Sequence, residues 1–145
     1  MNIQWDTDEE REEWMSQALI TIRAAEEMLL GDLAGDCIAN SFLAMIYAAR
    51  AALVGRGGEV TTWEEVISRF REAAAESGLS PENRRALPVV AELYRRVFVA
   101  GDMEADPVTA SACLDDARSF LEEVAGMMGF SIREEDEEDE EDWKP

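Results

Sequence analysis

The chain has no histidine among its 145 residues. This absence removes the side chain that most often acts as a general acid or base near neutral pH, and also the commonest metal ligand. Nucleophilic sites built on a Ser/His or Cys/His pair are therefore excluded. A site made of carboxylates alone remains open among 33 acids, although a solvated acidic face explains them more simply.

Cysteine and lysine are almost as scarce. Cys37 and Cys113 lack the C-x-x-C spacing of a zinc site. Each lies among apolar neighbours in a predicted helix, so we expect two reduced packing residues and no disulfide-linked partner. Lys144 is the only lysine, and the glycine-rich segment 55–58 is too short, and without a lysine, to cradle phosphate groups. We therefore predict neither a metal nor another cofactor.

Long apolar runs are also missing, while negative charge is in large excess. No stretch is typical of a membrane-spanning helix, and the charged segment 6–13 is not typical of a signal peptide. The formal net charge is −20, and residues 134–142 are all acidic. Without them and Lys144, residues 1–133 still hold 24 acids against 12 arginines. Such a charge repels nucleic acids and anionic membranes, so a cytoplasmic protein without a membrane partner is predicted.

The most apolar stretch is residues 36–55, where Arg50 is the only charged residue after the first position. Its apolar residues recur at steps of four and three, the helical period, at Ile38, Phe42, Met45, Ala49 and Ala52. We expect Asp36 to cap this helix and Gly55 to end it. A helix that is apolar nearly all round must be surrounded by others, so it is predicted to lie at the centre of the fold.

Four more helices are predicted from apolar periodicity and from capping and stop signals, at residues 7–30, 62–77, 81–100 and 106–129. Pro88 should kink or split the helix at 81–100. The longer part of that helix is expected to direct five side chains inward, namely Val90, Leu93, Tyr94, Val97 and Phe98. Together the helices predict an all-α, up-and-down antiparallel bundle over residues 1–130. The acidic segment 131–145 is expected to be a disordered tail.

Residues 40–53, NSFLAMIYAARAAL, resemble the second-helix signature of small prokaryotic HEPN-domain proteins, R-x-Y-Y-A-x-F-x-A-A-x-A-L-L. The alanines at 44, 48 and 49 match. Phe42 and Leu43 stand where the family has two tyrosines, and Asn40 replaces the arginine. Residues 62–70 resemble the family's T-H-x-x-V-x-x-x-F, with Trp63 in place of the histidine. The resemblance covers roughly residues 12–128 and implies a homodimeric all-α bundle.

The resemblance also implies where a reaction centre would lie. Many HEPN proteins are metal-independent ribonucleases whose site is an arginine and a histidine separated by four to six residues, paired across a homodimer. Tyr94, Arg95 and Arg96 stand at the matching place. The positions open to the histidine hold other residues: Ala100, Gly101, Asp102 and Met103. An aspartate is normally an anion near neutral pH and does not donate a proton as imidazolium does, so this departure argues against nuclease activity.

The remaining candidate binding residues lie on the central helix. Asn40, Tyr47 and Arg50 occupy successive turns of an otherwise apolar segment. Polar groups in such a helix either face a dimer seam or cavity, or form hydrogen bonds inside the bundle. Arg95 and Arg96 could bind phosphate or a partner's carboxylates. They could equally pair with local acids such as Glu92 and Asp102.

Three hypotheses for function follow. The first is a non-catalytic HEPN-like binding module, a homodimer that pairs with a nucleotidyltransferase-type protein or binds nucleotide or RNA in a toxin–antitoxin-like system. The second is a divergent HEPN ribonuclease that uses Arg95 or Arg96 with Asp102. The third is an acidic decoy that occupies the basic surfaces of nucleic-acid-binding proteins, as the tail and the net charge of −20 would allow.

Overall fold

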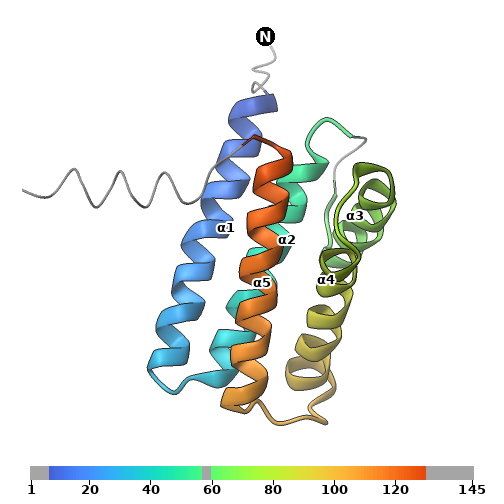
Figure 1. The fold of residues 1–145 in the computed structure, drawn as a ribbon. Coiled ribbons are helices and arrows are strands. Elements are labelled where there is room, and N and C mark those ends of the chain that lie inside the picture. Colours follow the sequence, from blue (N-terminus) through green and yellow to red (C-terminus); the bar gives the residue numbers. More distant parts are fainter. Residues whose placement is uncertain (1–6, 57–59, 130–145) are drawn as a thin grey trace, which may run out of the picture.

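The structure, a computed structural model, describes residues 7–56 and 60–129. In these residues it contains five α-helices and a π-helix (Figure 1): α1 (Thr7–Leu30), α2 (Ala34–Leu53), α3 (Trp63–Ser77), α4 (Pro81–Tyr94), η1 (Arg95–Ala100) and α5 (Pro107–Met127). The described part contains no strand, and the predicted all-α bundle is confirmed. The predictions made for the acidic tail fall outside the described residues.

Helix α2 lies at the centre of the bundle, as predicted. It packs against α1, α3, α4 and α5, and Figure 1 shows it behind α5, between α1 and the α3–α4 pair. Its alanines facing these neighbours have no exposed surface: Ala44, Ala48, Ala49 and Ala51. Methyl side chains let four neighbouring helices approach one axis closely, so a helix with this composition can serve only as a core helix.

The start of α2 differs from the prediction, because Asp36 is not its cap. The helix begins at Ala34, which places Asp36 in the first turn. The chain has already reversed through a closing turn at the end of α1, where Asp32 adopts a φ of 60°. There the N–H of Leu33 donates to the carbonyl of Met28 at 2.8 Å. Since this turn is complete at Leu33, α2 starts three residues earlier than the capping signal at Asp36 indicated.

Helices α3, α4 and α5 begin at the predicted caps. Thr62, Ser80 and Asp106 each accept a hydrogen bond from the backbone N–H three residues later, at 3.2, 3.3 and 2.8 Å. The start of α3 lies beside the middle of α2, because the rings of Trp63 and Phe42 are 5.4 Å apart. The rings of Phe70 and Phe120 are 5.2 Å apart, so α3 continues toward the far end of α5. Helix α3 therefore runs in the same direction as α2 and α5, so the all-α bundle does not alternate up and down between α2 and α3 as predicted.

Pro88 does not split its helix. Helix α4 is continuous from Pro81 to Tyr94. A proline inside a helix removes one backbone hydrogen bond, but Leu87 and Val90 on either side are buried, and their packing holds the segment helical.

The irregular part comes later, at the π-helix η1. A π-helix has more residues in each turn than an α-helix, so side chains after Tyr94 leave the register that an α-helical period predicts. Phe98 was expected to point inward and is 45% exposed. The prediction for Phe98 was therefore wrong, because it assumed one regular period from Val90 to the end of the segment.

A buried polar cluster joins the start of α4 to α5. Asn83, only 6% exposed, donates from Nδ2 to Oε1 of Glu123 at 3.1 Å. The same oxygen accepts the backbone N–H of Ser80 at 2.8 Å. Burial raises the pKa of Glu123, but these hydrogen bonds to the charged form outweigh it and leave the pKa below its ordinary value. The carboxylate therefore stabilises the junction only while it is ionised.

We predict that Glu123→Gln lowers the free energy of unfolding at neutral pH by about 1 kcal/mol, because hydrogen bonds to a charged acceptor are stronger than those to an amide. A lowered folded-state pKa gives stability that is complete above the unfolded pKa and is lost as pH falls through the folded pKa. The difference between the variant and the wild type should therefore shrink as pH falls below the ordinary pKa range of glutamate. Urea denaturation over a pH series measures this, with the exposed Glu76→Gln as the matched control. A constant difference at every pH would contradict the prediction.

The two cysteines are buried free thiols in the core, Cys37 on α2 and Cys113 on α5. The Cys37 thiol lies 3.7 Å from the carbonyl oxygen of Ala110. Burial raises the pKa of both thiols, and that of Cys113 to about 11. Because the thiolate is the reactive form, neither side chain is suited to nucleophilic chemistry at neutral pH.

We predict that both thiols resist a thiol-specific reagent at pH 8 in the folded protein and react rapidly once the chain is unfolded. Reaction rates measured with a chromogenic disulfide, with and without guanidinium chloride, test this. A Ser111→Cys variant supplies the control, since residue 111 is exposed on the same helix as Cys113 and its thiol should react without denaturant. Equal rates for Cys113 and the introduced cysteine would show that burial does not protect the native thiols.

Candidate functional site

The segment that carries Arg95 and Arg96 is the π-helix η1, which continues directly from α4. It ends where Gly101 adopts a φ of 66° and the backbone N–H of Asp102 donates to the carbonyl of Arg96 at 3.0 Å. Glycine adopts this left-handed conformation without steric cost. The turn brings Asp102 back toward the arginines, so the residues singled out in the sequence do lie together. π-Helical segments occur frequently at functional sites.

Arg95 is held by Glu92, one turn earlier on α4. The guanidinium donates from Nε to Oε2 at 3.0 Å and from Nη2 to Oε1 at 2.6 Å, a two-pronged contact. This hydrogen bonding lowers the pKa of Glu92 and raises the pKa of Arg95. Both side chains are about half exposed, so the pair adds little to stability but fixes the direction of the guanidinium.

Arg96 is held by Asp102. Its Nε donates to Oδ1 of the aspartate at 3.2 Å, and the two side chains are 46% and 57% exposed. The hypotheses that Arg96 acts with Asp102, and that it simply pairs with a local acid, thus describe one observed contact. In this contact Asp102 is the acceptor and Arg96 the donor. A carboxylate that accepts from a guanidinium has no proton to give to a leaving group.

Tyr94 lies in a cluster of four rings, which we call the aromatic cluster: Phe42, Trp63, Tyr94 and Phe98. The ring of Tyr94 stacks on Phe42 with centroids 4.7 Å apart, and it lies 6.5 Å from Trp63 and 5.1 Å from Phe98. Phe42 is buried, whereas Phe98 is exposed. The cluster ties η1 to the core helix α2, so the arginine segment has a rigid base although both guanidinium groups lie in solvent.

Asn40, Tyr47 and Arg50 all lie on one line along α2. With Asp36 and Leu43 they recur at steps of four and three, and each is at least partly exposed. We call these five residues the α2 stripe. Neighbouring helices cover the other sides of α2, so the stripe marks the side that they leave open. Asn40 uses its Nδ2 to donate to the carbonyl of Asp36 at 2.9 Å, a bond within the same helix.

Tyr47 and Arg50 meet a third side chain, Trp14 of α1. The Tyr47 ring stacks on the indole at 5.8 Å, and the guanidinium of Arg50 lies 4.9 Å from the centroid of the same ring. A guanidinium over an indole face is a favourable cation–π contact. Trp14 was not among the site residues predicted from the sequence. The register between α1 and α2 brings it to this position, and no local sequence signal encodes that register.

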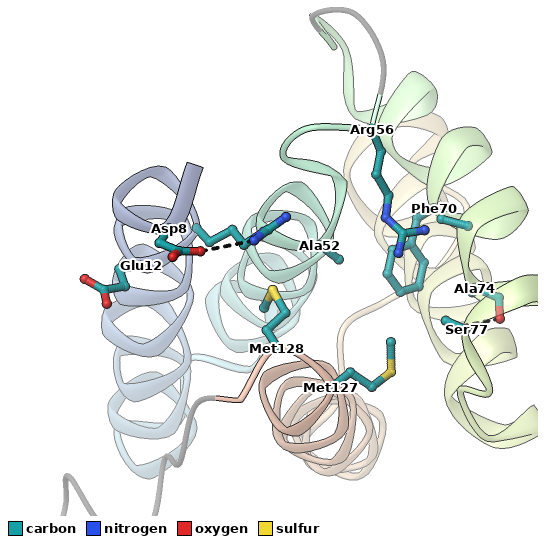
Figure 2. Close-up of a pocket in the computed structure, with 11 residues that line it drawn as sticks. Asp8, Glu12, Ala52, Arg56, Phe70, Ala74, Ser77, Met127 and Met128 are labelled. Carbon is teal, nitrogen blue, oxygen red and sulfur yellow. Dashed lines mark hydrogen bonds and ion pairs between the residues drawn. The ribbon is translucent and has the colours of Figure 1, made fainter. Parts of the chain in front are cut away.

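A pocket of about 490 Å³ lies at the end of the bundle where α1 begins and α5 ends. Figure 2 shows Phe70 and Ala74 of α3 facing Met127 and Met128, with Arg56 over the opening. Asp8 at the rim is already paired with Arg11 at 3.3 Å. None of the candidate residues on η1 or in the α2 stripe lines this pocket. The pocket and the candidate residues are therefore separate features.

Metal-ligand clusters and membrane-spanning helices are both absent from the described residues. Within residues 7–56 and 60–129, no group of three or more cysteine or carboxylate side chains could hold a metal ion. No helix in the same part of the chain is both long and apolar enough to cross a membrane.

Comparison with known proteins identifies one family whose model matches most of the chain. The model of the HEPN domain family matches residues 11–127, from the first turns of α1 to the last residue of α5. This range agrees with residues 12–128, where the sequence resemblance was found. It includes η1, the aromatic cluster and the α2 stripe. A search of curated proteins finds no match.

Proposed function

The chain belongs to the HEPN domain family, and from this premise we propose that it is a non-catalytic HEPN-type binding module. One observation carries the proposal. Asp102 occupies a position where the family's ribonuclease motif implies histidine, and it accepts a hydrogen bond from Arg96 at 3.2 Å. The pair holds an arginine in place but supplies no general acid. What remains of the arrangement is a fixed guanidinium on a rigid segment, which suits binding.

The charge distribution favours a protein partner over nucleic acid. Both guanidinium groups of η1 are already bonded to carboxylates, so a phosphate would have to displace those acids. The formal net charge of −20 opposes the approach of RNA at long range. We therefore propose a nucleotidyltransferase-type protein as partner, as in toxin–antitoxin-like pairs of the cytoplasm. Binding of nucleotide or RNA is the alternative.

We further propose that the module is a homodimer and that the α2 stripe forms the seam. HEPN domains commonly dimerise. Support comes from the chemistry of the stripe: Leu43 is 39% exposed on a helix that is otherwise buried, and Tyr47 and Arg50 are already ordered by their contacts with Trp14. Aromatic residues and arginine are enriched at the centres of protein interfaces. Side chains ordered before association lose less entropy on binding.

A divergent ribonuclease is the second candidate, and the turn at Gly101, which brings Asp102 back beside the arginines, is the observation that favours it. The non-catalytic proposal predicts that the purified protein cleaves RNA in the absence of metal no faster than its Arg96→Ala variant. A labelled RNA assay compares the wild type with Arg96→Ala, Asp102→Ala and the exposed Arg85→Ala, which serves as the matched control. Cleavage that survives in Arg85→Ala but disappears in the other two variants would establish the ribonuclease instead.

The homodimer has its own test. Native mass spectrometry at low salt should show a dimer, and the double variant Leu43→Glu/Arg50→Glu should be monomeric. Two added carboxylates on each copy repel across the seam, and a tenfold or greater weakening corresponds to about 1.4 kcal/mol or more. Val108→Glu is the control, because residue 108 is exposed on the first turn of α5, away from the stripe. A dimer that persists in the double variant would place the seam elsewhere.

Native mass spectrometry of the protein purified from its own cells tests whether it binds a nucleotidyltransferase-type partner. A second polypeptide of nucleotidyltransferase size at fixed stoichiometry is the expected result. A homodimer that carries nucleotide or RNA instead would favour the alternative ligand class.

A further inference from the structure

Five large apolar side chains are strongly exposed at one end of the bundle. Leu30 is 87% exposed, Leu33 48%, Phe98 45%, Val99 68% and Val108 80%. They come from three segments, the α1–α2 turn, η1 and the first turn of α5. Figure 1 shows these segments together at the end opposite the start of α1. We call this group the apolar end.

The three segments are in direct contact. A Cβ atom placed on Gly35 would lie 3.6 Å from Cζ of Phe98 and 3.7 Å from Cβ of Ala105. The first turn of α2 therefore lies against both η1 and the segment that leads to α5. Asp106 fixes the start of α5 by accepting from the N–H and the hydroxyl of Thr109 at 2.8 and 3.1 Å. The apolar end is thus a surface on anchored backbone.

This exposure requires an explanation. Single exposed apolar residues are common on proteins, but adjacent ones from several segments mark interaction sites. Leu30 alone leaves most of its side chain in water at the very end of α1. Burial against a partner would stabilise the complex by removing this apolar area from water.

The charges around the apolar end identify the partner's chemistry. The segments that form it hold five exposed acids: Asp32, Asp36, Asp102, Glu104 and Asp106. Within residues 28–37 and 95–109 the only basic residues are Arg95 and Arg96, and they are bonded to Glu92 and Asp102. An apolar centre with an acidic rim is complementary to apolar side chains surrounded by lysine or arginine. A second copy of this chain is disfavoured here, because its acids would face the same acids.

We propose that the apolar end is the docking surface for a basic amphipathic segment of another protein. The five apolar side chains of this surface lie outside the α2 stripe, which shares only Asp36 with the surrounding acids. The proposal deepens the proposed binding role, on which it rests, by stating where a protein partner docks and what chemistry it presents. The RNA-cleavage and dimer tests can contradict the proposals they address without contradicting this docking surface. The docking test below can likewise give a negative result without contradicting the non-catalytic role or the homodimer.

The test uses the full chain, labelled for NMR, and a synthetic helical peptide with leucines on one face and lysines on the other. Binding should shift the amides of the α1–α2 turn, η1 and the first turn of α5. The double variant Leu30→Ser/Val99→Ser should bind at least tenfold more weakly, whereas Ile20→Ser should bind like the wild type. Ile20 is 60% exposed on α1 and so provides a matched loss of apolar surface away from the apolar end.

The dependence of peptide affinity on salt and on peptide charge is the second measurement. Raising the salt from about 0.1 M to about 1 M shortens the Debye length from about 10 Å to about 3 Å, so the affinity should fall several-fold. A peptide with glutamates in place of the lysines should not bind. The acidic residues 134–142 attract any basic peptide, which is why the site of the shifts decides the outcome. Shifts confined to those residues, or equal affinity for the wild type and Leu30→Ser/Val99→Ser, would overturn the proposal.

Discussion

The burial of α2 by four neighbouring helices is the constraint on which the other features depend. Small side chains let so many neighbours approach closely, and four alanines of α2 are fully buried, Ala44, Ala48, Ala49 and Ala51. A helix surrounded in this way has few positions left for a polar side chain. Asn40, Tyr47 and Arg50 therefore share one stripe. The packing of α1 on the same helix then brings Trp14 against two of them.

The arginine side chains of the π-helix η1 are positioned by charge pairing, whereas the side chains of α2 are positioned by close packing. Arginine cannot lose its proton in a protein, so Arg95 and Arg96 are permanent cations. In a chain this acidic they are satisfied by the nearest carboxylates, Glu92 and Asp102. Salt links of this kind between exposed groups are weak and exchange readily. The two salt links therefore hold the guanidinium groups only loosely, and a reaction that needs a proton donor finds none in the Arg96–Asp102 pair.

Much of the fold could be predicted from the sequence, because it depends on local rules. Caps at Thr62, Ser80 and Asp106 are encoded within three residues, and the core position of α2 follows from its composition. The errors have non-local or backbone causes. Asp36 is not the cap because the preceding turn closes early, and Phe98 is exposed because η1 departs from the α-helical period.

Within the candidate site, the pairing of Arg96 with Asp102 could be predicted from their spacing in the sequence. The contact of Trp14 with Arg50 depends on the register of two helices and could not.

The packing of α3 has a consequence for how the molecule opens. Helix α3 runs parallel to α2 and is held to the bundle by few buried residues. Helix α3 buries three residues, Val66, Phe70 and Ala74, against eleven in α2. Detaching α3 therefore exposes far less apolar surface than separating α2 from α1. Local unfolding of α3 is therefore expected to cost less free energy than local unfolding of α2.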